Sequence, residues 1–78
     1  MHVLLYSTSS CSFCGRAREL LERHGVRYDE RSLDGDRALR ERLARMFGAA
    51  TMPYVLIDGE PLGGLAELER LAAEGGLS

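Results

Sequence analysis

The sequence predicts an α/β fold in which strands and helices follow one another in the order βαβαββα. Two short apolar runs, residues 3–6 and 54–57, are typical of strands buried on both faces of a sheet. Three other segments repeat apolar residues at helical spacing. Asp58-Gly59 is a strong hairpin signal, so the last two strands should pair antiparallel. Right-handed strand–helix–strand connections then predict a parallel core with an antiparallel edge.

The first helix is expected from about Ser12 to His24, with Ser10 as its N-cap and Gly25 as its stop. Its inward face should carry the residues that recur at helical spacing, which are Phe13, Ala17, Leu20, Leu21 and His24. We interpret His24 as a helix-end residue rather than a catalytic base. The next strand, at residues 26–29, alternates apolar and charged residues, which places it at or near a sheet edge.

The second helix should follow a turn at residues 34–36 and end at Gly48. Its predicted core stripe consists of Leu39, Leu43, Met46 and Phe47. A brief strand at residues 61–62 should pair back onto residues 54–57, and the last helix is expected over residues 65–74. Tyr6 and Tyr54 are interpreted as packing residues.

Composition limits the classes of function. The chain has 78 residues, which predicts a single domain, 1–78, and a hydrophobic content of 45% is typical of a packed globule. A net charge of −2, without basic blocks, argues against nucleic-acid and membrane partners. The apolar runs are too short for a signal peptide or a membrane span, so a cytoplasmic location is expected. Stable disulfides are rare there, so two cysteines favour catalysis or metal binding.

The cysteine pair Cys11-Ser12-Phe13-Cys14 lies where the first strand meets the first helix. This spacing places both sulfurs on one face of a helical turn, within disulfide reach. A helix N-terminus lowers the pKa of a cysteine, and Arg16 and Arg18, without an acidic residue among the first 18 residues, should act in the same direction. We therefore predict that Cys11 is the nucleophilic thiolate and Cys14 the resolving thiol.

Three other interpretations of the pair remain open. The cysteines could be two buried structural residues, or they could form a static disulfide. They could also form half of a zinc site, for which only His2 and His24 are available as further ligands.

Two further motifs are candidates for a binding site. If the bond before Pro53 in Thr51-Met52-Pro53 is cis, the backbone of Met52 would face outward and could pair with an extended peptide. Alternatively, Pro53 is a plain strand-start proline. The N–H groups that follow Gly63-Gly64 could bind a carboxylate, although the glycine pair could also be a simple turn.

Together these landmarks resemble the glutaredoxins, which have the thioredoxin fold. The resemblance covers nearly the whole chain, and the landmarks are Cys11-Ser12-Phe13-Cys14, the segment 16–21, Thr51-Met52-Pro53, Ile57-Asp58-Gly59 and Gly63-Gly64. It implies a four-stranded mixed sheet flanked by three helices, a cis Pro53, and glutathione as reductant. The implied activity is the reduction of protein disulfides and glutathione mixed disulfides.

The resemblance also implies a glutathione site, in which this chain departs from the family pattern. Thr8 stands where the family usually has a lysine, Arg45 is the best basic candidate in the second helix, and Ala66 leaves only Glu67 as an acid after the double glycine. The implied contacts are Thr8, Ser12, Phe13, Arg45, Thr51, Met52, Pro53, Gly64, Leu65, Ala66 and Glu67. Losing one charge-assisted contact should weaken glutathione binding without abolishing it.

Two other functions remain as alternatives. One is a redoxin reduced by a thioredoxin-reductase-like flavoenzyme, for example as a donor to ribonucleotide reductase. The missing lysine and the missing acid at Ala66 favour this alternative, and the double glycine argues against it. The other is a [2Fe-2S] carrier that is dimeric through Cys11 and two glutathiones. Ser12, in the place of the family's usual proline, resembles family members that can hold such a cluster between two subunits. The leading hypothesis is a monomeric enzyme without a metal site.

Overall fold

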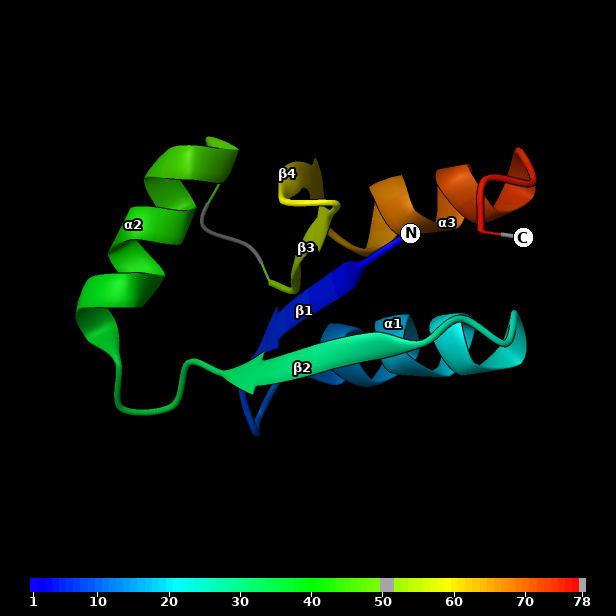
Figure 1. The fold of residues 1–78 in the computed structure, drawn as a ribbon. Helices are drawn as coiled ribbons and strands as arrows, with labels where there is room; N and C mark the ends of the chain where they lie inside the picture. Colours follow the sequence, from blue (N-terminus) through cyan, green and yellow to red (C-terminus); the bar gives the residue numbers. More distant parts are fainter. Residues whose placement is uncertain (50–51, 78) are drawn as a thin grey trace.

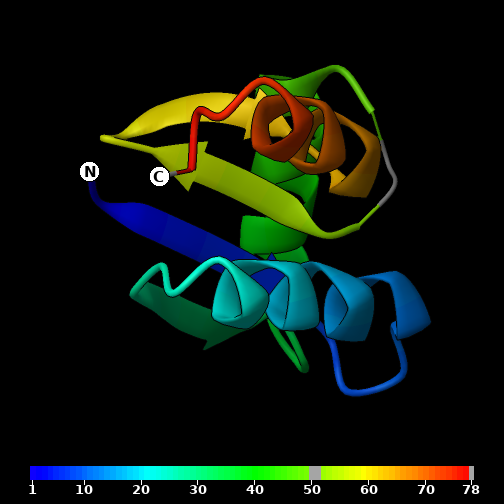
Figure 2. The same ribbon diagram turned by 90° about the vertical axis from the view of Figure 1, so that its right-hand side faces the viewer.

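The computed structural model describes every residue of the chain except 50, 51 and 78. The described residues form the predicted sequence of elements, which are β1 (Val3–Ser7), α1 (Ser12–Arg23), β2 (Tyr28–Ser32), α2 (Arg37–Phe47), β3 (Tyr54–Ile57), β4 (Glu60–Gly63) and α3 (Leu65–Ala73). The strands make one sheet in the order β2-β1-β3-β4 (Figure 1). Helices α1 and α3 cover one face of this sheet, and α2 lies on the other (Figure 2).

The sheet is mixed, as the resemblance implied, but its parallel part is smaller than the chain order alone suggested. Only β1 and β2 pair in parallel, in the register Val3↔Tyr28 to Ser7↔Ser32. Strand β3 runs antiparallel to β1, and β4 runs antiparallel to β3. The expected parallel core is therefore wrong: after α2 the chain enters β3 on the far side of β1 and in the opposite direction.

Two hydrophobic cores lie on the two faces of the sheet. The core under α1 and α3 consists of Val3, Leu5, Ala17, Leu21, Val55, Leu68 and Leu77. The core under α2 consists of Leu33, Leu43 and Tyr54, and the ring of Phe47 packs against Tyr54 with centroids 4.9 Å apart. Alternate residues of β1 face opposite sides, so a short apolar strand supplies both cores.

Three residues of the predicted inward stripes lie at the surface. Phe13 and Met46 are 52% and 55% exposed, and His24 is also exposed. Phe13 lies in the first turn of α1, beyond the end of β1, where no sheet covers it. His24 closes α1, with its Nδ1 atom 3.0 Å from the carbonyl oxygen of Leu20, so the helix-end interpretation holds although the inward orientation does not.

Strand β2 begins two residues later than expected and lies at the predicted edge of the sheet. Val26 does not extend the strand, because its N–H donates to the carbonyl of Leu21 at 3.0 Å and its side chain packs on the first core. The strand itself is Tyr28-Asp29-Glu30-Arg31-Ser32, and all but Tyr28 are exposed. At the opposite edge, β4 carries the exposed residues Glu60 and Pro61.

The β3–β4 hairpin turns at Asp58-Gly59, as predicted. Both residues have positive φ angles, 53° and 83°, which a tight two-residue hairpin turn requires. The hairpin therefore returns the chain toward the end of the sheet at which β1 leads into α1. None of the helices in the described part of the chain is long and apolar enough to cross a membrane.

Candidate active site

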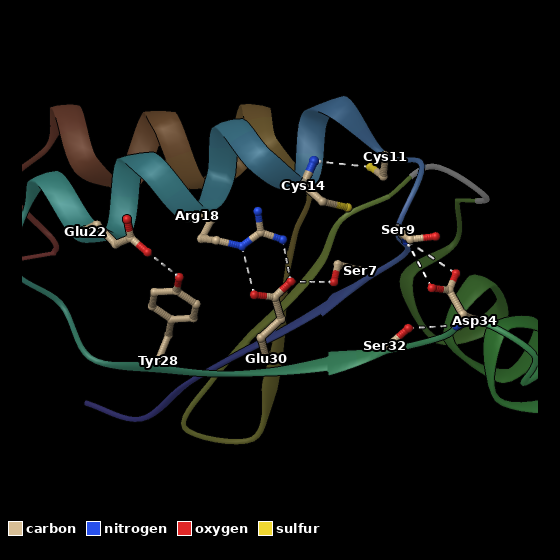
Figure 3. Close-up of polar contacts among 10 residues, drawn as sticks. All are labelled: Ser7, Ser9, Cys11, Cys14, Arg18, Glu22, Tyr28, Glu30, Ser32 and Asp34. Atoms are coloured by element: carbon tan, nitrogen blue, oxygen red, sulfur yellow. Dashed lines mark hydrogen bonds and ion pairs between the residues drawn. The ribbon is translucent and has the colours of Figure 1, made fainter.

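Cys11 is the N-cap of α1. Its backbone is extended (φ −94°, ψ 108°), and its Sγ atom accepts the N–H of Cys14 at 3.2 Å (Figure 3). The expectation that Ser10 caps the helix is therefore wrong: the loop that leaves β1 is one residue longer, and Cys11 N–H donates to Thr8 O at 3.3 Å. The sulfur thus lies where the unpaired N–H groups of the helix point, a position that favours negative charge.

Cys14 lies in a different environment. It is fully buried, whereas Cys11 is partly exposed. Burial, together with a hydrogen bond between the two cysteine side chains, raises the pKa of Cys14 to about 12, while Thr8 and Arg18 act in the opposite direction. An accessible capping sulfur and a buried protonated sulfur in one turn of helix are suited to attack and to resolution, respectively.

A hollow of about 330 Å³ opens beside Cys11. Its lining residues are Thr8, Ser10, Cys11, Ser12, Phe13, Arg40 and Met52. The structure therefore brings together Cys11 and four of the residues predicted to bind glutathione. Thr51 lies outside the described residues.

The basic residue of this hollow is Arg40, not Arg45. Arg45 is exposed in the last turn of α2 and does not line the hollow. Leu39 packs against the second core, and Arg40, the next residue of α2, turns toward Cys11. The sequence pattern shows the apolar stripe but not the angle at which α2 crosses the end of the sheet, so it could not separate the two arginines. A guanidinium here can bind a carboxylate through two parallel hydrogen bonds.

The proline and glycine motifs meet beside the start of α3. The Met52–Pro53 bond is cis, as the resemblance implied. Gly64 packs so closely on this segment that a Cβ atom would lie 3.3 Å from Pro53 O. Gly63 has φ 138°, and its Cβ would lie 2.6 Å from Cγ of Glu67. A side chain at either glycine would therefore crowd its neighbours, and Gly63 also has a backbone conformation that favours glycine.

Glu67 has a structural partner. Its Oε1 atom accepts the N–H of Gly64 at 2.7 Å, which closes the N-terminus of α3. Gly64 and Glu67 line a second hollow of about 240 Å³, separate from the one beside Cys11. Leu65 is half-buried against the first core, Ala66 is exposed, and neither lines either hollow. These predicted contacts therefore lie apart from the Cys11 hollow.

The two arginines of α1 each contact an acidic residue of another element. Arg16 lies over the ring of Phe13, 5.7 Å from its centroid, and its Nη2 atom is 3.7 Å from a carboxylate oxygen of Glu69 on α3. Arg18 is held by Glu30 through two hydrogen bonds of 2.9 and 2.6 Å (Figure 3). Each guanidinium thus contacts an acidic residue that is distant in sequence. The number of charges near the cysteine motif does not predict these contacts.

The described residues contain no group of three or more His, Cys, Asp or Glu side chains that could hold a metal ion. His2 contacts Asp29 through its Nε2 atom at 2.9 Å, and His24 closes α1. Neither histidine forms a cluster with the cysteines.

A Cys-x-x-Cys pair at the start of α1, a cis proline before β3 and a four-stranded mixed sheet define a thiol–disulfide oxidoreductase of the thioredoxin fold. The glutaredoxin family model matches residues 3–62. The chain is 38% identical to glutaredoxin 3 of Escherichia coli over 97% of its length and 92% of the relative's. It is 40% identical to a glutaredoxin of Pseudomonas aeruginosa over 96% of its length and 89% of the relative's. The chain therefore belongs to the glutaredoxin family.

Solved structures agree with this assignment. The solution structure of a glutaredoxin from Brucella melitensis superposes with a TM-score of 0.87 at 31% identity, covering 99% of this chain and 84% of that one. A buckwheat glutaredoxin–glutathione complex also gives a TM-score of 0.87, at 28% identity, covering 96% of this chain and 71% of that one.

Proposed function

We propose that this enzyme reduces glutathione mixed disulfides and protein disulfides, with Cys11 as the nucleophile and Cys14 as the resolving thiol. The contrast between the two sulfurs carries the proposal: Cys11 caps α1 and is accessible, whereas Cys14 is buried and protonated. The proposed working unit is a monomer. Cysteines that cycle between thiol and disulfide fit the reducing cytoplasm.

The chemistry follows from these positions. The Cys11 thiolate attacks one sulfur of the substrate disulfide, a Cys11–substrate disulfide forms, and the other half leaves as a thiolate. Cys14 then attacks the Cys11 sulfur, the Cys11–Cys14 disulfide forms, and the substrate thiol leaves with the proton that Cys14 gives up. When the bound partner is glutathione, a second glutathione can release it from Cys11 without Cys14.

Glutathione is the proposed reductant, and the hollow beside Cys11 is its proposed site. Arg40 supplies a guanidinium for one of its carboxylates, and Met52 lines the same hollow. The solved buckwheat complex with glutathione supports this ligand class. Thr8 offers no charge to the ligand, and Glu67 is used to cap α3, so glutathione would be held by fewer charged groups than the family pattern has.

The test uses the purified chain with glutathione, glutathione reductase, NADPH and a small glutathione mixed disulfide. Turnover should be lost in Cys11→Ser and retained in Cys14→Ser, whereas reduction of a protein disulfide should require both cysteines. Arg40→Gln should raise the KM for the mixed disulfide, and Arg45→Gln is its matched control on the same helix. Reduction by thioredoxin reductase but not by glutathione would refute the proposed donor, and activity in Cys11→Ser would refute the proposed roles.

A further inference from the structure

A polar network joins α1 to the two parallel strands, one helical turn after Cys14. The carboxylate of Glu30 on β2 accepts three hydrogen bonds, from Nε of Arg18 at 2.9 Å, from Nη2 of Arg18 at 2.6 Å and from Oγ of Ser7 at 2.6 Å. Ser7 is only 4% exposed and lies at the end of β1. Arg18 thus has a fixed geometry, in contrast to an ordinary surface arginine.

The network lies on the face of α1 that carries the resolving cysteine. Arg18 is four residues after Cys14, so the two residues lie about one helical turn apart on the same face of α1, and the Arg18 guanidinium points toward Glu30 (Figure 3). The charged groups that act on Cys14 are Cys11 and Arg18, and they act in opposite directions. The Cys11 charge disappears once that sulfur is in a mixed disulfide, whereas the charge of Arg18 remains.

We propose that Arg18, held by Glu30 and Ser7, is a positioning residue that stabilises the negative charge developing on Cys14 as it resolves the mixed disulfide on Cys11. This inference rests on the proposed roles of the two cysteines. In this step the Cys14–Cys11 bond forms, the Cys11–substrate bond breaks, and the substrate thiol leaves with the Cys14 proton. Arg18 transfers no proton: it lowers the energy of a thiolate inside a buried turn.

Glu30 has two opposing effects in this arrangement. Its carboxylate holds the guanidinium in one position about a helical turn from Cys14, and its negative charge offsets part of the positive charge that Cys14 experiences. Glu30→Gln removes the negative charge but keeps the shape of the side chain. This change should therefore leave Arg18 near Cys14 and make the electrostatic potential at the Cys14 sulfur more positive. A purely structural bridge between α1 and β2 would instead be weakened by a change on either side.

The experiment measures the resolving step alone. Reduced protein is mixed with oxidised glutathione, quenched with acid at set times, and the Cys11–glutathione mixed disulfide and the internal disulfide are quantified by mass spectrometry between pH 6 and 9. At neutral pH, Arg18→Gln should slow conversion of the mixed disulfide by about threefold to tenfold, the effect expected for one partly solvated charge. Arg18→Lys should retain most of the rate, and Glu30→Gln should resolve at least as fast as wild type.

The Cys14→Ser background supplies the specific control. Turnover by the monothiol route does not use Cys14, so adding Arg18→Gln to Cys14→Ser should leave it unchanged. Slower resolution in both Arg18→Gln and Glu30→Gln, or an unchanged rate in Arg18→Gln, would overturn the inference. Failure of the wild type to form any mixed disulfide at Cys11 would instead overturn the proposed function on which it rests.

Discussion

The burial of Cys14 predicts that its thiol is protected from alkylation in the folded protein. With a pKa of about 12, Cys14 has on the order of one thiolate in 10,000 molecules at pH 8, whereas a cysteine with an ordinary pKa of about 8.5 is roughly one-quarter ionised. Only the thiolate reacts with iodoacetamide. Ionisation alone therefore slows alkylation of Cys14 by roughly two-thousandfold, and its complete lack of exposure slows it further.

The measurement uses Cys11→Ser, in which Cys14 is the only thiol. Burial is the largest cause of the raised pKa, so Cys14 should stay protected although its partner sulfur is gone. The protein is treated with iodoacetamide from pH 6 to 10 and analysed by mass spectrometry, with the same variant unfolded in urea as the control. A folded rate within about tenfold of the unfolded rate would refute the interpretation of Cys14 as a buried thiol.

Three further predictions concern stability, measured by urea unfolding. Gly63→Ala should destabilise the fold by about 1–3 kcal/mol more than Gly59→Ala, because both positions have positive φ but nothing lies within 4 Å of a Cβ at Gly59; equal losses would contradict the proposed clash. Tyr54→Phe should cost about 1 kcal/mol, since the buried hydroxyl donates to a carbonyl at 2.9 Å; no change would exclude a useful hydrogen bond. The Arg18 guanidinium lowers the pKa of Glu30, so Glu30 stabilises the fold above the ordinary carboxyl pKa, and this contribution is lost as pH falls through the lowered value. Glu30→Gln should therefore be about 1 kcal/mol less stable at pH 7, with the gap closing toward pH 3, and a constant gap would contradict that linkage.

Local patterns predicted the elements that apolar periodicity marks strongly. The runs at 3–6 and 54–57 are strands, and the Asp58-Gly59 turn has the expected positive φ angles. Strand β2 was harder to place because four of its five residues are exposed, so no apolar pattern marks its start. Its position depends instead on pairing with β1, a contact between residues about 25 positions apart.

The sequence predicted the cysteine, proline and glycine motifs of the candidate site, but not the partners of its charged residues. The Cys-x-x-Cys pair lies at the start of α1, the double glycine lies at the start of α3, and the bond before Pro53 is cis, as the resemblance implied. The partners of Arg16 and Arg18 are Glu69 and Glu30, which only the packed fold brings near. Leu77, nine residues after Leu68, the buried residue of α3, also joins the first core, and no local pattern marks it.

The composition of the outer strands has a consequence for behaviour in concentrated solution. An open sheet leaves unpaired N–H and C=O groups along its two borders, where another polypeptide can add as a strand. Here one border carries the charged run Asp29-Glu30-Arg31, and the other carries Glu60 and Pro61. Charges and proline oppose edge-to-edge aggregation, so this thiol–disulfide oxidoreductase is protected from joining other polypeptides through its backbone.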